Sequence, residues 1–374
     1  MRYDAIVDMM VQNTSAMPNY QNNYTDDLND GNQTEVVVQW QDCTFFNFVL
    51  WGVVGSSFCI LGMMGNALSF TAFQKDRRTP AVTLLQCLAC SDFVLLLAVF
   101  ITDDIPYACD YSPTCENIWS FWPYIRYIWL ITPMSHMCSI WFVVLIAMNR
   151  YWAVCRPHNM HRFWSLERTV IYVIGVVCMV FVFNVPRFFE YRIDLITKED
   201  NVTTFLKEMR TDFGMHYGYK VVYKAYLVNI LLILIPLITL ILLTIPIILA
   251  IHIQKRANKG KPKTTLSKAS QEITFVLSLV LVVAIVCQTP LAVFHFIRYK
   301  YRYYCGDFVY YLDNVSKLFV TINSSINFVI YCLFSSRFRR LLIATAFCKG
   351  KNWLQQIEPY SSTRREYGMS YLRG

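Results

Sequence analysis

Seven long runs of predominantly apolar residues divide this sequence and constrain its fold more than any other feature. A helix needs roughly 20 such residues to cross the bilayer core, and lipid offers the backbone no other hydrogen-bond partners, so each run is expected to be helical. Charged residues make up 16% of the chain, against about a quarter in a typical soluble protein. The sequence therefore predicts an all-α membrane protein, a seven-transmembrane-helix bundle. The expected spans are Phe46–Phe73, Ala81–Ile101, Tyr124–Val154, Val170–Pro186, Tyr223–Ile251, Ile273–Ile297 and Phe308–Phe334.

The chain divides into four parts around these runs. Residues 1–45 form a leader rich in Asn, Asp and Gln, a composition that favours disorder. Residues 46–334 form the bundle. Residues 335–348 have an amphipathic pattern, which predicts a short helix lying on the inner leaflet after the seventh span. Residues 349–374 form a polar tail.

The charges between the spans predict which helix ends face the cytoplasm, because short cytoplasmic loops are enriched in Lys and Arg. The leader is acidic, whereas basic residues such as Arg78, Arg162, Lys259 and Arg340 follow the first, third, fifth and seventh spans. We therefore expect a multi-pass protein of the plasma membrane with its N-terminus outside and its C-terminus in the cytoplasm. The net charge of +9 reflects this topology and contact with anionic lipid. It gives no reason to expect a nucleic-acid partner.

Modification motifs agree with this orientation. Sequons for N-glycosylation begin at Asn13, Asn23, Asn32 and Asn201, all on the expected outer face. Cys348 follows the amphipathic stretch and is a candidate for palmitoylation, with a free thiol as the alternative.

Four cysteines are expected on the oxidising side of the membrane: Cys43, Cys109, Cys115 and Cys305. Four cysteines allow three full pairings, and the sequence does not choose among them.

Short motifs within the spans occur in the order found in one large receptor family. They are Gly65-Asn66, Leu88-Ala89-Cys90-Ser91-Asp92, Asn149-Arg150-Tyr151, Cys287-Gln288-Thr289-Pro290 and Asn323-Ser324-Ser325-Ile326-Asn327-Phe328-Val329-Ile330-Tyr331, with Pro236 in the fifth span. In these motifs the chain resembles the rhodopsin-like (class A) G-protein-coupled receptors across nearly the whole membrane region. The segment Asn184–Glu190 is similar to one typical of invertebrate receptors for FMRFamide-related neuropeptides.

The resemblance implies a receptor, not an enzyme, that binds an extracellular peptide ending in Arg-Phe-amide and signals through a heterotrimeric G protein. It also implies that kinases and arrestin act on the tail, where Ser361–Thr363 supplies hydroxyl groups. A class A receptor for an unrelated peptide or small ligand is the alternative, and a seven-span channel or transporter is a more remote one. Repeat symmetry or a polar pore lining would favour the latter, and the sequence displays neither.

Two other receptor classes lack a required residue. By the same resemblance, an opsin needs Lys where this chain has Thr321, and an amine receptor needs Asp where it has Thr132. The sequence also displays no metal cluster, nucleophile with its base or phosphate loop that would indicate catalysis.

Asp92 is a carboxylate in the middle of an apolar span. Such residues face the bundle interior and find partners there, because a charge in the bilayer core costs at least about 2.5 kcal/mol. The resemblance implies that Ser139, Asn323, Ser324 and Asn327 surround it and form an allosteric sodium site that favours the inactive state. Oxygen ligands suit such a hard cation. The alternative is a polar, water-filled network without an ion.

The resemblance assigns the conformational switch to Arg150 and Tyr151 of the third span, Pro290 of the sixth and Tyr331 of the seventh. In the family, an acid beside the arginine holds it in the inactive state, and the arginine meets the G protein in the active state. Here that neighbour is Asn149, so we expect a weaker inactive lock. Alternatively, Arg150 only extends to the lipid interface.

The candidate ligand contacts lie toward the outer ends of the spans. Asp103, Asp104 and Glu190 could pair with a ligand Arg, although each could instead be a solvated loop charge. Phe294 and Tyr310 could receive a ligand Phe ring or belong to an interfacial aromatic belt.

His295 and Gln288 could hydrogen-bond an amide of the ligand. The loop Arg187–Val222 contains no cysteine, so the disulfide that usually anchors this loop in the family is absent. The loop is then less ordered, or tied down through Cys43, Cys109, Cys115 or Cys305.

Overall fold

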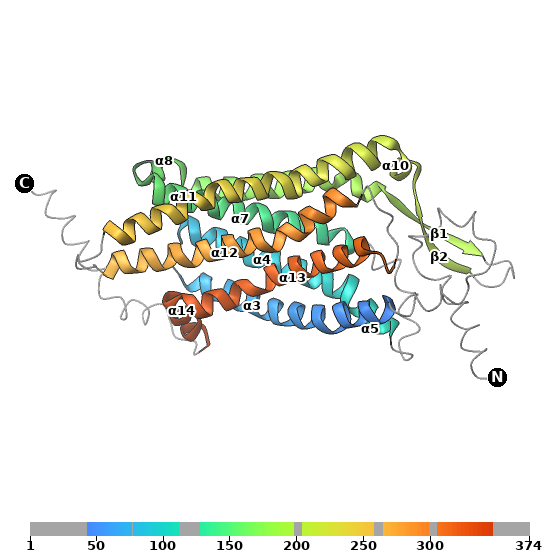
Figure 1. Ribbon diagram of the computed structural model, residues 1–374, viewed down its shortest axis with the longest axis horizontal. Coiled ribbons are helices and arrows are strands. Elements are labelled where there is room, and N and C mark those ends of the chain that lie inside the picture. The colour runs from blue at the N-terminus through green and yellow to red at the C-terminus, as the bar shows by residue number, and fades with distance from the viewer. Residues whose placement is uncertain are drawn as a thin grey trace, which may run out of the picture.

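The computed structural model describes residues 43–76, 78–111, 128–197, 204–257, 265–298 and 305–346. Within these residues, seven helical segments are long and apolar enough to cross a membrane. They are Cys43–Lys75, Pro80–Cys109, Ile131–Cys155, Leu166–Phe189, Gly218–Gln254, Glu272–Ile297 and Phe308–Phe334. Figure 1 shows the helices lying side by side along the long axis of the molecule. The prediction of a seven-helix bundle is confirmed.

Several spans combine α-helix with tighter or wider turns. The first four spans contain η2 (Phe48–Gly55), α3 (Ser56–Lys75), α4 (Pro80–Val99), η3 (Phe100–Asp104), α5 (Ile105–Asp110), α7 (Ile131–Cys155), α9 (Leu166–Asn184) and η6 (Val185–Phe189). Between α7 and α9 lie η5 (Pro157–Asn159) and α8 (Met160–Phe163). The remaining helices are α10 (Asp212–Met215), η7 (Gly218–Leu227), η8 (Ile230–Leu234), α11 (Ile235–Ala257), α12 (Thr265–Ile297), α13 (Phe308–Phe334) and α14 (Ser336–Ala346).

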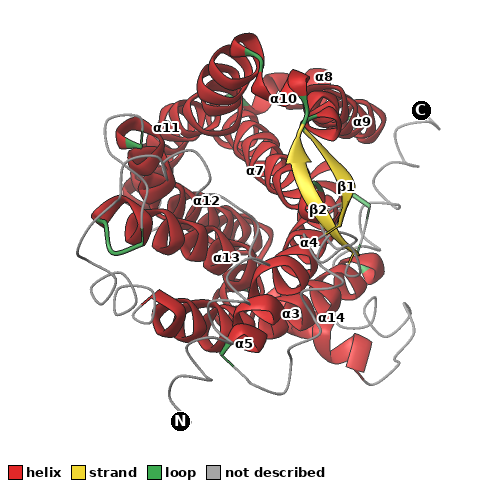
Figure 2. Ribbon diagram, turned by 90° about the vertical axis from the view of Figure 1, so that its right-hand side faces the viewer, coloured by secondary structure: helices red, strands yellow, loops and turns green. Residues whose placement is uncertain are grey.

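A β-hairpin joins the fourth and fifth spans. Its strands, β1 (Tyr191–Thr197) and β2 (Thr204–Arg210), are antiparallel and pair Tyr191 with Arg210. The hairpin lies at one end of the bundle and α14 at the other (Figure 1). Figure 2 looks onto the hairpin end, with the helices running away from the viewer. We call these the hairpin end and the α14 end.

Polar caps start two of the spans. Thr79 precedes α4 and its hydroxyl accepts a hydrogen bond from the Val82 amide at 3.3 Å, with Pro80 in the first turn. Ser165 caps α9 in the same way through the Arg168 amide at 3.2 Å. These side chains satisfy amides that have no partner within the first helical turn.

The third span occupies the interior of the bundle and the fourth lies at its edge. In their most apolar stretches, 61% of third-span residues are buried, against 22% of fourth-span residues. Helix α7 packs against α4, α9, α11 and α12. Side chains on α7 therefore contact most of the other spans.

Glycines bring the first and seventh spans into close contact. A Cβ added to Gly65 would lie 2.7 Å from the Phe328 Cβ, and one added to Gly62 would lie 2.5 Å from the Ser325 hydroxyl oxygen. Small residues permit this approach between membrane helices. The Asn66 side-chain amide uses the proximity to donate a hydrogen bond to the Ser324 carbonyl at 2.8 Å.

Several spans are longer than the apolar runs alone predict. The second continues to Cys109, the fourth to Phe189, and the fifth begins at Gly218. The expected runs were ended at polar residues. Inside the bundle such residues are buried or paired, as Asp104 and Lys224 are, so the helices continue past them. The expected start of the third span, Tyr124, lies outside the described residues. The short helix expected after the seventh span is confirmed as α14.

Candidate functional site

Asp92 forms the polar centre of the bundle. Its side chain is fully buried in α4. The carboxylate accepts hydrogen bonds from the hydroxyls of Ser139 at 2.6 Å and Ser324 at 2.9 Å, and from the Asn327 amide at 2.9 Å. Three spans, α4, α7 and α13, therefore converge on one carboxylate. Asn323 is buried on α13, but among the described residues it makes no hydrogen bond with Asp92.

Arg150 lies near the α14 end of α7. Its Nη2 atom donates a hydrogen bond to Asn149 Oδ1 at 3.0 Å. Within the described part of the chain, Arg150 Nε and the Asn149 side-chain nitrogen are buried without a hydrogen-bond partner. The arginine is thus hydrogen-bonded to a neutral amide and not to a carboxylate. The neighbouring Tyr151 ring contacts Trp152.

The sixth span contacts the start of α14 through Glu272. The Glu272 carboxylate accepts hydrogen bonds from the Ser336 backbone amide and from the Ser336 hydroxyl, the latter at 2.7 Å. The Ser335 hydroxyl accepts from the Phe338 amide at 3.2 Å. A carboxylate at a helix N-terminus is favourable because amides there lack partners and carry a partial positive charge. Glu272 was not among the residues predicted from the sequence.

Further contacts fasten α14 to the first span. Arg337 forms an ion pair with Asp76, and the Lys75 ammonium donates to the Ala344 carbonyl at 2.7 Å. The buried Tyr331 ring lies 5.7 Å from the Phe73 ring and 5.4 Å from the Phe338 ring. Tyr331 therefore lies where the first span, the seventh span and α14 meet.

Helix α12 contributes several of the predicted ligand residues at the hairpin end. Gln288 is buried and its side-chain nitrogen lies 3.0 Å from His136 Nε2. Among the described residues, Gln288 Oε1 and His295 Nδ1 are buried without a hydrogen-bond partner. The Phe294 ring contacts the His295 ring at 5.3 Å. Pro290 lies inside this helix, where it removes a backbone hydrogen bond.

The predicted acidic ligand contacts have different surroundings. Asp103 accepts a hydrogen bond from the Thr102 hydroxyl at 2.7 Å. Asp104 is buried toward the first span, where a Cβ on Gly55 would lie 2.6 Å from its Oδ1 atom. The Tyr310 hydroxyl donates to the Asn47 side-chain carbonyl at 3.0 Å. Asp104 therefore lies within the contact between the first two spans, whereas Asp103 is half-buried.

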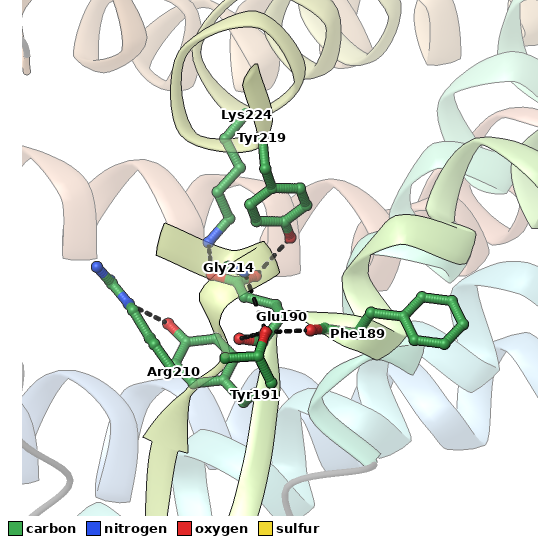
Figure 3. Close-up of polar contacts among 8 residues, drawn as sticks. Phe189, Glu190, Tyr191, Arg210, Gly214, Tyr219 and Lys224 are labelled. Atoms are coloured by element: carbon green, nitrogen blue, oxygen red, sulfur yellow. Dashed lines mark hydrogen bonds and ion pairs between the residues drawn. The ribbon is translucent and has the colours of Figure 1, made fainter. Parts of the chain in front are cut away.

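Glu190 is buried and already paired. Its carboxylate accepts a hydrogen bond from the Tyr219 hydroxyl at 2.7 Å and forms an ion pair with Lys224 (Figure 3). The alternative of a solvated loop charge is therefore wrong for Glu190.

The sequence matches the family model described as serpentine type 7TM GPCR chemoreceptor Srw over residues 56–349. The chain belongs to this family of G-protein-coupled receptors. The receptor is 27% identical over 307 residues to the FMRFamide receptor of Drosophila melanogaster, covering 80% of this chain and 53% of that protein. It is 27% identical over 298 residues to the FMRFamide peptide receptor frpr-18 of Caenorhabditis elegans, covering 76% of this chain and 66% of that protein. The allatostatin-A receptor of Bombyx mori is 23% identical over 343 residues, covering 90% of this chain and 88% of that protein.

The prediction of a rhodopsin-like G-protein-coupled receptor is confirmed, and the family consists of receptors, not enzymes. The receptor spans about half to two thirds of the length of the first two relatives.

One disulfide of the receptor selects among the three possible pairings. Cys43 and Cys305 are bonded, with their Cα atoms 6.1 Å apart, so the start of the first span is linked to the segment before the seventh. Neither cysteine ties down the loop between the fourth and fifth spans. That loop forms a hairpin instead of a less ordered segment. Cys115, the four sequons and Cys348 lie outside the described residues of the receptor.

Several charged contacts of the receptor were not predicted from the sequence. Lys317 and Asp313 form an ion pair at 2.8 Å within α13, and their spacing of four residues signals such a contact. The acidic Glu272 beside the basic segment between the fifth and sixth spans is a weaker signal. No sequence signal indicates that Lys224 pairs with Glu190, because their contact crosses the hairpin.

Proposed function

We propose that this receptor binds a short peptide ending in Arg-Phe-amide at its hairpin end and activates a heterotrimeric G protein at its α14 end. The hairpin end then faces the extracellular medium and the α14 end the cytoplasm, as the basic loops favour. The observation that carries the ligand class is the similarity to a protein named FMRFamide receptor over 80% of this chain.

The geometry at the hairpin end supports an amidated ligand. A C-terminal amide presents N–H donors, whereas a free carboxylate presents only acceptors. Gln288 Oε1 and His295 Nδ1 are buried acceptor candidates on α12 that lack partners among the described residues. Buried polar atoms gain most from a partner that satisfies them. The ligand Arg is assigned to Asp103, and the terminal Phe ring to Phe294.

A screen of amidated neuropeptides on cells expressing the receptor tests this assignment. We expect a response to FMRFamide and a response at least about tenfold weaker to the same peptide with a free carboxylate, because a carboxylate cannot donate to the two acceptors. Untransfected cells are the control, and an N-terminal tag stained on intact cells measures surface receptor. A response restricted to peptides without Arg-Phe-amide would remove the proposed ligand class and keep the receptor assignment.

Signal transfer in this proposal requires the sixth span to move outward at the α14 end, so that a G protein meets Arg150. A ligand shifts this equilibrium only through a higher affinity for the active arrangement. The Asn149 amide and the Glu272 contact with Ser336 both stabilise the arrangement that the structure describes.

Replacing Asn149 with Asp is expected to lower ligand-free signalling about fivefold. A carboxylate would hold Arg150 by a charge-assisted hydrogen bond, which is about 1 kcal/mol stronger than a neutral one. The measurement is G-protein activation without ligand, normalised to surface receptor. Ligand-free signalling equal to or above wild type in the variant would contradict the weak-lock account.

We also propose that the Asp92 centre binds sodium. The carboxylate and the hydroxyl oxygens of Ser139 and Ser324 fit a small hard cation, because both hydroxyls lie within 2.9 Å of Asp92. The Asn327 amide would hold the carboxylate in place. Asn323 is left out of this site because it makes no hydrogen bond with Asp92 among the described residues.

A further inference from the structure

Glu190 joins three parts of the hairpin end. It follows η6 at the end of the fourth span and precedes β1, and its carboxylate contacts Tyr219 and Lys224 of the fifth span. The Lys224 ammonium also lies 6.0 Å from the centre of the Tyr191 ring and 5.8 Å from that of Tyr219. Such distances permit cation–π attraction. The side chains of Tyr219 and Lys224 converge on the Glu190 carboxylate in Figure 3.

The backbone of Glu190 also closes the base of the hairpin. Its carbonyl accepts from the Thr211 amide at 3.0 Å, and the Thr211 hydroxyl donates to the Phe189 carbonyl at 2.6 Å. A Cβ on Gly214 would lie 2.3 Å from the Glu190 carbonyl oxygen, so any larger residue there would push this backbone apart. The segment that leaves β2 is thereby held against the segment that enters β1.

The charges around Glu190 argue against its use as the acceptor of a ligand Arg. Its side chain is 3% exposed, and Lys224 already neutralises it. Arg187 and Arg210 also lie close enough to interact electrostatically with Lys224. A ligand cation would have to displace Lys224 from a buried carboxylate while two further cations repel it.

We propose that Glu190 is a positioning residue and that Glu190, Tyr219 and Lys224 form a non-covalent clamp in place of the missing loop disulfide. The clamp fixes the hairpin to the fifth span at the ligand-binding end. The effect of the clamp on ligand binding rests on the proposed function, whereas the effect of the clamp on the hairpin is independent of any ligand.

The first test measures backbone amide exchange of residues 191–197 and 204–210 in purified full-length receptor without ligand. Lys224→Met leaves the Glu190 charge buried without its partner, and Glu190→Gln removes that charge. We expect each variant to speed exchange at least about tenfold, because local opening follows the loss of buried contacts. Asp194→Asn is the control, because it breaks a 2.8 Å ion pair with Arg192 that lies exposed on the same hairpin. The exchanged pair, E190K with K224E, should recover most of the lost protection, and wild-type exchange in both single variants would overturn the clamp.

The second test measures the potency of FMRFamide on the same variants. If the three residues act as a clamp, Glu190→Gln and Lys224→Met should both lower the potency of FMRFamide. If Glu190 instead bound the ligand Arg, removing the competing Lys224 would raise potency while Glu190→Gln lowered it, and that opposite pair would overturn the proposal. If FMRFamide does not act on the receptor at all, the proposed function fails while the exchange measurement still decides on the clamp.

Discussion

Replacing Glu272 with Gln is expected to raise ligand-free signalling about fivefold. The Glu272 carboxylate accepts two hydrogen bonds from Ser336 at the first turn of α14. The proposed outward movement of the sixth span must break both contacts. Hydrogen bonds to charged groups contribute about 1.5–3 kcal/mol, and partial exposure here reduces the loss to about 1 kcal/mol, which corresponds to roughly a fivefold change in population.

The control for this prediction is Glu167→Gln. Glu167 is an exposed acidic residue in the first turn of α9, so its replacement changes the net charge equally without touching α14. Ser336→Ala should raise signalling less than Glu272→Gln, because the backbone amide still donates. Ligand-free signalling of Glu272→Gln that equals wild type at equal surface density would show that this contact does not restrain the sixth span.

Replacing Asp92 with Asn is expected to abolish the response of the receptor to sodium. In wild type, exchanging sodium for an equal concentration of N-methylglucamine should raise ligand-free signalling, because the ion stabilises the inactive arrangement. The Asn side chain would keep the shape of the carboxylate but lose the charge that attracts a cation. Ser325→Ala is the matched control, since Ser325 lies on the same helix as Ser324 and bonds to Phe58 and Thr321 instead of Asp92.

Replacing Asp92 with Ala is expected to lower the melting temperature of the purified receptor more than the Asn replacement does. It leaves the three groups that donate to Asp92 without an acceptor, and each unsatisfied buried group costs about 1–3 kcal/mol. A response to sodium in the Asp92→Asn variant equal to that of wild type would contradict sodium binding at Asp92. An unchanged melting temperature in the Ala variant would show that the hydrogen bonds to Asp92 do not stabilise the bundle.

The spans could be predicted from the sequence because a segment that crosses lipid must be helical and needs roughly 20 apolar residues. Asp92 was predictable for the same reason, since an apolar helix can accommodate a carboxylate only in the bundle interior. Its neighbours Ser139, Ser324 and Asn327 follow from the motifs, and the structure brings them together. Asn323 is buried on the same helix but makes no hydrogen bond with Asp92 among the described residues, because neighbouring positions on one helix point in different directions.

Contacts between distant segments were less predictable. Cys43 could have paired with any of three other cysteines, and only the packing of the first span against the seventh selects Cys305. Glu190 was expected to pair with a ligand Arg because it lies at the outer end of the fourth span and Arg–carboxylate pairs are strong. Its partner Lys224 lies 34 residues away on the fifth span, and the hairpin between the two residues was not predicted from the sequence. The contact between Glu272 and Ser336 likewise depends on where α14 begins.

The most direct test of the receptor account is nucleotide exchange on G proteins in membranes that contain the receptor. The measurement compares FMRFamide with an analogue in which Gln replaces the peptide's Arg. The expected result is that FMRFamide stimulates exchange and that the analogue requires at least about a tenfold higher concentration, because the analogue cannot form the proposed charged pair with Asp103. Equal stimulation by both peptides, or none by any Arg-Phe-amide peptide with the receptor at the cell surface, would contradict it.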